Sequence, residues 1–183
     1  MVVIGVNENN QKQVIGIQSG DKESPSSWRE TFKDLKRRGL NSQTITLGIM
    51  DGLSGLEQVF REEFPQGKIQ RCHVHVARNV LVKVPQKLKQ KAAADIRSIF
   101  YAHNRKKAME FSTPFTERWS KDVPSAVKCL QNFLDSCLTF LDFPEQEWIS
   151  LQTTNVIERL NKEFKRRTKP MEIVAGENAC YSC

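Results

Sequence analysis

The sequence has no apolar run that approaches the roughly 20 residues of a membrane-spanning helix. Its opening residues, MVVIGV, lack the basic leader of a secretory signal peptide and are too short to be one. The five cysteines are odd in number and irregularly spaced, which favours reduced thiols over a disulfide framework. There is no internal repeat and no low-complexity stretch. We therefore expect a cytoplasmic protein that neither crosses nor needs a membrane.

Size and charge suggest a partner. A chain of 183 residues suits one domain, or one domain with an insertion, and 39% hydrophobic residues are enough for a core. The net charge of +7 and the pI of about 9.3 favour a polyanionic partner, nucleic acid before membrane. Charge alone does not decide this, because many basic proteins bind no DNA.

The first part of the chain has an α/β pattern. β-branched runs at 2–7 and 13–18, separated by Asn and other polar residues, predict a hairpin. Ser27 and Glu30 form a capping box for a helix from Trp28 that ends at a glycine, and Ser54 and Glu57 form a second one. Further strands are predicted at two ranges, 44–50 and 68–75. Such an order is typical of a mixed α/β fold.

The rest of the chain is predicted to be helical. Residues 77–151 show helical periodicity, with breaks near Pro85, Asn104, Pro124 and Pro144. A last helix over 155–167 has an apolar side and a basic side.

Asp51 is the first candidate for chemistry. It ends a predicted buried strand, and catalytic groups of α/β sheets usually lie at that edge. A carboxylate there could hold a divalent metal. The alternative is that Asp51 caps the next helix or forms the Asp-Gly turn, and position alone favours this alternative.

Glu158 is the second candidate, in the first turn of the last predicted helix. The alternative is again a capping role, with Asn155 as N-cap and Glu158 three residues later. The same helix carries a run of cations that could contact phosphates: Arg159, Lys162, Lys165, Arg166, Arg167 and Lys169. The alternative is a solvated face, partly neutralised by the i, i+4 pairs Glu158–Lys162 and Arg159–Glu163.

Cys72 and His75 form a C-x-x-H motif at the end of the predicted fourth strand, with His73 between them. Two ligands are half of a zinc site, and no second pair with suitable spacing follows, which disfavours structural zinc. In strand alternation Cys72 would face one side and His73 and His75 the other, so a packed thiol with polar histidines at a cleft edge is the simpler interpretation.

Taken together, MDGLSGLEQVF, RCHVHVARNV and TTNVIERLNKEFKRRTKPMEIVAGENACY resemble the hallmark segments of bacterial Mutator-type insertion-sequence transposases, a DDE class. VVIGVNENNQKQVIGIQSG and SWRETFKDLKRRGL fit the same family in order, so the resemblance covers about residues 2–181. It implies an RNase H-like (retroviral integrase) mixed sheet: residues 1–76 as the first part of the catalytic core, 77–151 as a helical insertion, and 152–183 as the segment with the third acid.

The resemblance implies metal-dependent DNA cleavage and strand transfer, with Asp51 and Glu158 as the second and third acids of the triad. It implies two Mg²⁺ or Mn²⁺ ions, DNA as substrate, and a homo-oligomer that works at the nucleoid. Cys72 and His75 match a family motif of unassigned role. In the family the first acid lies on a central strand just before Val2.

Without that strand we expect little or no strand transfer by this chain alone, and marginal stability. We also expect unpaired sheet edges, unless the hairpin slides over to pair with residues 44–50. The alternatives are a non-catalytic DNA-binding remnant, a nuclease of the same fold, and a module that binds a partner subunit.

Overall fold

The computed structural model describes residues 1–18 and 24–168, and its chain divides into two compact units. The first unit comprises Met1–Thr46, Leu53–Gly67 and the segment from Thr154 onward. The second comprises Leu47–Gly52 and Lys68–Thr153. None of the described helices is both long enough and apolar enough to cross a membrane.

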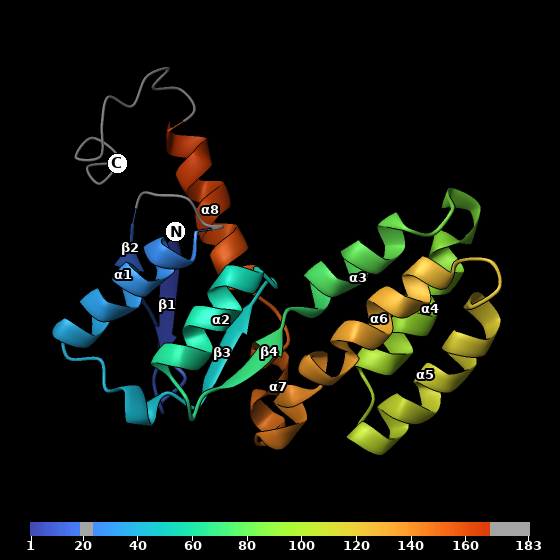
Figure 1. The fold of residues 1–183 in the computed structure, drawn as a ribbon, viewed down its shortest axis with the longest axis horizontal. Coiled ribbons are helices and arrows are strands. Elements are labelled where there is room, and N and C mark those ends of the chain that lie inside the picture. The colour runs from blue at the N-terminus through green and yellow to red at the C-terminus, as the bar shows by residue number, and fades with distance from the viewer. Residues whose placement is uncertain (19–23, 169–183) are drawn as a thin grey trace. The chain divides into compact units, whose positions relative to one another are not determined.

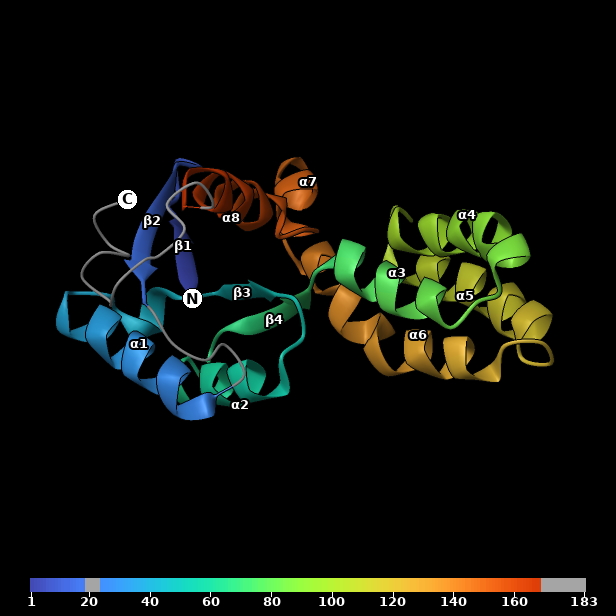
Figure 2. The ribbon, with the colours of Figure 1, turned by 90° about the horizontal axis from the view of Figure 1, so that it is seen from above.

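The first unit begins with the expected hairpin, β1 (Val2–Val6) and β2 (Lys12–Ile17), which pair antiparallel. Three helices accompany it: α1 (Pro25–Arg37), α2 (Ser54–Glu63) and α8 (Asn155–Thr168). Figures 1 and 2 show α8 alongside the hairpin, and α8 contacts β1. The predicted hairpin and last helix are therefore confirmed.

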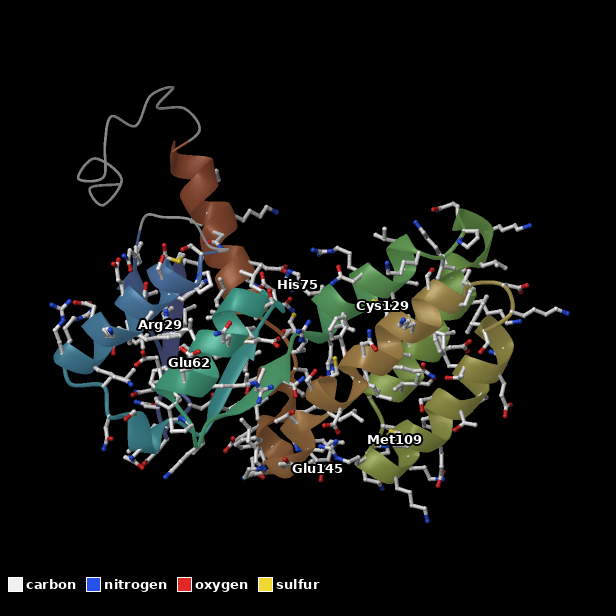
Figure 3. All side chains as sticks on the ribbon, viewed as in Figure 1. Arg29, Glu62, His75, Met109, Cys129 and Glu145 are labelled. Carbon is white, nitrogen blue, oxygen red and sulfur yellow. The ribbon has the colours of Figure 1, made fainter. Side chains whose placement is uncertain are left out.

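Aromatic rings join α1 to α2. Phe32 of α1 lies 5.1 Å from Phe64 and 6.2 Å from Phe60, measured between ring centroids, and all three side chains are buried. Each buried aromatic side chain contributes on the order of 1.5–3 kcal/mol relative to an exposed one. Ion pairs border these rings: Arg29 with Glu62, both labelled in Figure 3, and Lys36 with Glu63 at 2.8 Å.

Both predicted capping boxes are wrong. Helix α1 starts at Pro25 with Ser24 as N-cap, because proline has a backbone already suited to the first helical position. Helix α2 has Leu53 as N-cap, and neither N-cap side chain makes a capping hydrogen bond. Ser27 and Ser54 therefore lie inside their helices rather than before them.

The predicted end of α1 is confirmed. Gly39 has φ of 105°, its N–H donates to Lys36, and the N–H of Leu40 donates to Leu35. This pair of bonds is the Schellman motif, in which glycine takes the left-handed position without a steric penalty.

The second unit contains a short parallel sheet and a helical bundle. Strands β3 (Leu47–Met50) and β4 (Lys68–Arg71) pair in parallel, with Met50 opposite Arg71. The helices are α3 (His73–Val82), α4 (Lys89–Phe100), α5 (Arg105–Trp119), α6 (Pro124–Cys137) and the short α7 (Trp148–Leu151). Figure 2 shows α3 to α6 packed side by side, and they share one apolar core. The expected helical segment, with breaks near four Pro or Asn residues, is confirmed.

Short 3₁₀ helices lie at Ser42–Thr44, Gln86–Leu88, Thr139–Asp142 and Glu145–Glu147.

Buried Gln70 of β4 connects the sheet to the end of α6. Its amide donates to the carbonyl of Cys137 at 2.9 Å, and its Oε1 accepts from the N–H of Phe140 at 2.8 Å. These bonds satisfy polar groups that would otherwise be costly to bury.

Two strand boundaries differ from the prediction. Residues 44–46 precede β3 rather than belonging to it, and β4 ends at Arg71 instead of residue 75. Cys72 is the N-cap of α3, so the strand alternation expected for Cys72 to His75 is wrong. In HVHVARNV, His73, Val76 and Val80 are the buried side chains, and their spacing is helical.

The fold is mixed α/β, mostly helical with two small sheets, which agrees with the expected class. Among the described residues, strands pair as β1–β2 in the first unit and as β3–β4 in the second. Pairing of the hairpin with residues 44–50, the alternative to unpaired sheet edges, stays a prediction.

Candidate active site

Asp51 directly follows β3 at the edge where both parallel strands end. The N–H of Cys72 donates to the carbonyl of Met50 at 2.9 Å, which continues the pairing by one residue beyond β4. Asp51 is exposed. Its predicted place at the carboxyl end of a strand is confirmed, and an exposed carboxylate there can offer oxygen ligands to a divalent cation.

The structure bears on the two alternative roles of Asp51, as a helix cap and as a turn residue. Helix α2 has Leu53 as its N-cap, so Asp51 does not cap it. Gly52 has a φ of 96°, in the left-handed region that favours glycine. Residues 51–53 form no hydrogen-bonded turn, so the chain after β3 requires a glycine at position 52 rather than a carboxylate at position 51.

Arg71 is a neighbour of Gly52 that was not among the predicted site residues. A Cβ built on Gly52 would lie 3.0 Å from Cζ of Arg71 and closer still to Nη1. The Cζ atom also lies 4.1 Å from the ring centroid of Phe133 on α6. The half-buried Arg71 therefore brings a positive charge to Gly52, the residue that follows Asp51.

The C-x-x-H motif lies at the start of α3. Cys72 is fully buried, and His75 is half-buried and labelled in Figure 3. His73 is buried between aromatic rings, stacked on Phe100 at 4.5 Å and edge-on to Phe140 at 5.3 Å. Burial lowers the pKa of His73 to about 4, although its bond to the carbonyl of Cys137 opposes that shift. The His73 ring is thus neutral at pH 7 and has a packing role.

The second unit has three cysteines, Cys72, Cys129 and Cys137, and none of them forms a disulfide. Burial raises the pKa of Cys129 and, more strongly, that of Cys137, although the charge of Arg71 opposes both shifts. Within residues 1–18 and 24–168, no three His, Cys, Asp or Glu side chains are grouped so that they could hold a metal ion. Cys180 and Cys183 lie outside the described residues.

Glu158 lies in the first turn of α8 and is half-buried. Its N–H donates to the carbonyl of Thr154 at 3.1 Å, so Thr154 precedes the helix and Glu158 is its fourth residue. The alternative in which Asn155 is the N-cap is therefore wrong. Asp51 belongs to the second unit and Glu158 to the first, and their pairing around a metal stays a prediction.

The basic face of α8 is partly neutralised by an acid of the same helix. Arg159 and Lys162 are exposed, whereas Arg166 forms an ion pair with Glu163 at 2.6 Å, which raises the pKa of Arg166. This is an i, i+3 pair, and the expected i, i+4 pairs Glu158–Lys162 and Arg159–Glu163 stay a prediction. The side chains of Lys165 and Arg167, and the whole of Lys169, lie outside the described part of the chain.

The family model described as "Transposase, Mutator family" matches residues 1–182. The chain belongs to the Mutator family of transposases. The resemblance drawn from its three motif segments is therefore confirmed.

Several bacterial transposases are similar to this Mutator-family chain over almost its whole length. That of insertion sequence IS905 from Lactococcus lactis is 33% identical over 178 residues, which are 97% of this chain and 45% of the relative. That of IS6120 from Mycolicibacterium smegmatis is 35% identical over 92% of this chain and 52% of the relative. That of IST2 from Acidithiobacillus ferrooxidans is 34% identical over 92% and 56%. The chain thus spans about half the length of the curated relatives it matches.

A second basic segment of this Mutator-family chain was missed in the sequence. Residues 64–94 contain no Asp or Glu and seven Lys or Arg. Lys68 pairs with Asp142 at 2.7 Å, but four others are exposed cations on α3, α4 and the segment between them: Arg78, Lys83, Lys87 and Lys91. The next acid, Asp95, already binds Arg118 at 2.8 Å and the indole of Trp119 at 2.9 Å. A count of charges in a sliding window would have found this segment.

Proposed function

We propose that this chain is part of a DDE-class transposase that cleaves and joins DNA strands with divalent metal ions. The observation that carries the proposal is the family match over residues 1–182 together with Asp51 at the carboxyl end of β3. An RNase H-like core belongs to the same proposal, supported by a hairpin followed by a parallel pair that ends at an acid.

Mg²⁺ or Mn²⁺ fits the donor chemistry of the two candidate residues. Both ions prefer carboxylate oxygens, and Asp51 is exposed while Glu158 is half-buried in a helical first turn. The bound ions would activate a water or a 3′-hydroxyl and offset charge on the leaving oxygen. The protein would hold the ions through Asp51 and Glu158 and orient the DNA by its cations.

The basic segment 64–94 supports DNA as the partner. Lys89 and Lys91 occupy the first turn of α4, which contains no acid. Cations there oppose the helix dipole, which favours negative charge at a helix N-terminus. A bound polyanion would remove this conflict, and the phosphates of DNA supply such charge. The exposed Arg159 and Lys162 of α8 are further cations that could contact DNA phosphates.

Metal titration tests the site. We expect Mn²⁺ to bind the chain and to raise its affinity for a DNA duplex, and we expect Asp51→Asn to abolish both effects. The matched control is Asp122→Asn, which removes an exposed acid of the same unit. DNA binding that depends on salt but not on metal or Asp51 would identify a non-catalytic DNA-binding remnant instead.

Strand cleavage and assembly have separate tests. A cleavage assay on transposon-end DNA measures metal-dependent activity, and our expectation is that this chain alone shows little or none. Robust cleavage abolished by Asp51→Asn would contradict that expectation and support the DDE assignment. We also propose a homo-oligomer on DNA at the nucleoid, which mass measurement of the DNA complex would test.

A further inference from the structure

Tyr101 presents an aromatic ring at the surface of the second unit, directly after α4. Its exposed fraction of 58% is the largest of the Phe, Tyr and Trp side chains that the structure describes. Its neighbours Phe100 and Ala102 are buried, and its N–H donates to the carbonyl of Arg97 at 3.0 Å. The phenol ring lies edge-on to the buried imidazole of His73, with 6.3 Å between ring centroids. The ring is thus exposed although the backbone and one ring contact fix its place.

A cation accompanies this ring. Arg97, in the last turn of α4, holds its guanidinium 5.6 Å from the ring centroid of Tyr101, close enough for a cation–π contact. The side chain of Arg97 is exposed, and it pairs with no acid within residues 1–18 and 24–168. Residues 96–109 contain no Asp or Glu, so no acid close in the chain offsets this charge.

An exposed ring beside an unpaired cation has the two features that bind an unpaired nucleotide. The π face of the ring can stack on any nucleobase, and arginine donates to phosphate oxygens. A base inside a duplex is already stacked on its neighbours, so only a base outside the double helix can use the ring. Phe111 is 43% exposed, but no cation lies over its ring in the described part of the chain, so it lacks the second feature.

We propose that Tyr101 and Arg97 bind one unpaired nucleotide of the DNA substrate, with the base stacked on the tyrosine ring and its phosphate bonded to the arginine. The proposal rests on DNA being the partner. It adds a contact with single-stranded DNA that the exposed cations of 64–94 do not require.

The position of the ring suits such a contact. His73, against which the ring lies, begins α3 just after β4 ends at Arg71. Arg71 pairs with Met50, the last residue of β3. The ring therefore contacts the helix that starts from the same end of the sheet as Asp51, and cleavage of a strand there would leave bases free to unpair.

Affinity for single-stranded DNA tests the pair. Binding of the 183-residue chain to a thymidine oligonucleotide of about 10 nucleotides, and to a duplex of the same length, is measured over a series of NaCl concentrations in EDTA. We expect Tyr101→Ala to lower single-strand affinity about tenfold without changing the slope of log affinity against log salt, because stacking is not ionic. Duplex affinity should stay native. We expect Arg97→Gln to reduce the single-strand slope by about 0.7, the value for one phosphate.

Matched variants separate the aromatic ring from side-chain size and from exposure alone. Tyr101→Phe keeps the ring and should bind single strands as the native chain does, whereas Tyr101→Leu should bind as weakly as the alanine variant. Phe111→Ala removes an exposed ring without a cation and should leave single-strand affinity native. If thermal unfolding shows that Tyr101→Ala is misfolded, the comparison of the phenylalanine and leucine variants decides.

Equal affinity in Tyr101→Phe and Tyr101→Leu would overturn the proposal, and so would a native slope in Arg97→Gln or an equal loss in Phe111→Ala. A native chain that binds the duplex but not the single strand would overturn it and leave the proposed function standing. A native chain that binds neither DNA would overturn both.

Discussion

Acid should destabilise the second unit through the buried imidazole of His73. Burial lowers its folded pKa to about 4 from an ordinary 6.5. Between these values the unfolded chain binds a proton that the folded chain does not, so the stability of the fold rises with pH in this window. The contribution is complete above pH 6.5 and is lost as the pH falls toward 4.

The magnitude follows from the difference between the two pKa values. Between pH 7.5 and pH 5, one such group changes the free energy of unfolding by about 2 kcal/mol, since each unit of pKa difference corresponds to about 1.4 kcal/mol. We expect the native chain to lose about 2 kcal/mol more than His73→Gln over this range. Glutamine keeps a donor for the carbonyl of Cys137 and removes the titrating ring.

Urea unfolding followed by circular dichroism at the two pH values measures this difference. The control is His103→Gln, which removes an exposed imidazole from the same unit. Equal pH dependence in the native chain and in His73→Gln would refute the reasoning, and so would an effect of similar size in His103→Gln.

Three further outcomes are expected from the contacts of the second unit and from one control in the first. Gly52→Ala should lower the thermal stability more than Gly39→Ala. Alanine would cost about 1–2 kcal/mol at either position because both have a positive φ, but only at Gly52 would the new Cβ also meet Arg71. Equal thermal shifts would contradict this. Gln70→Leu should cost about 1–3 kcal/mol in urea unfolding, because it leaves the buried N–H of Phe140 without its acceptor. The thiol of Cys137, buried and with a raised pKa, should resist iodoacetamide at pH 8 until the chain is unfolded, and rapid modification of the native chain, read by mass spectrometry, would count against that.

Local patterns predicted what depends on neighbours in the chain. The hairpin follows from two β-branched runs with a polar turn, and the end of α1 follows from Gly39, since both signals act within a few residues. Asp51 was placed at a strand end by the same kind of signal, an apolar run stopped by Asp-Gly. The family followed from whole segments, because many positions matched at once.

Local patterns failed where the same sequence fits both a strand and a helix. The alternation in HVHV fits a strand, while His73, Val76 and Val80 fit a helix equally well. Strand β4 pairs with β3 only as far as Met50, the last residue of β3. Residues 73–76 therefore have no strand to pair with, and they form the start of a helix instead. Serine with glutamate three residues later likewise suggested capping boxes, but Pro25 and Leu53 set the actual helix starts.

By itself the sequence determined the α/β order, the helical segment, the strand-end position of Asp51 and membership of the Mutator family. The tertiary structure alone decided that Arg71 lies against Gly52 and Phe133, and that His73 and Gln70 both bond to the carbonyl of Cys137. The physical reason is distance along the chain. The two bonds to Cys137 join residues that are more than 60 positions apart in the chain. Which distant side chains meet determines how deeply a residue is buried, how far its pKa shifts and how much space a glycine leaves.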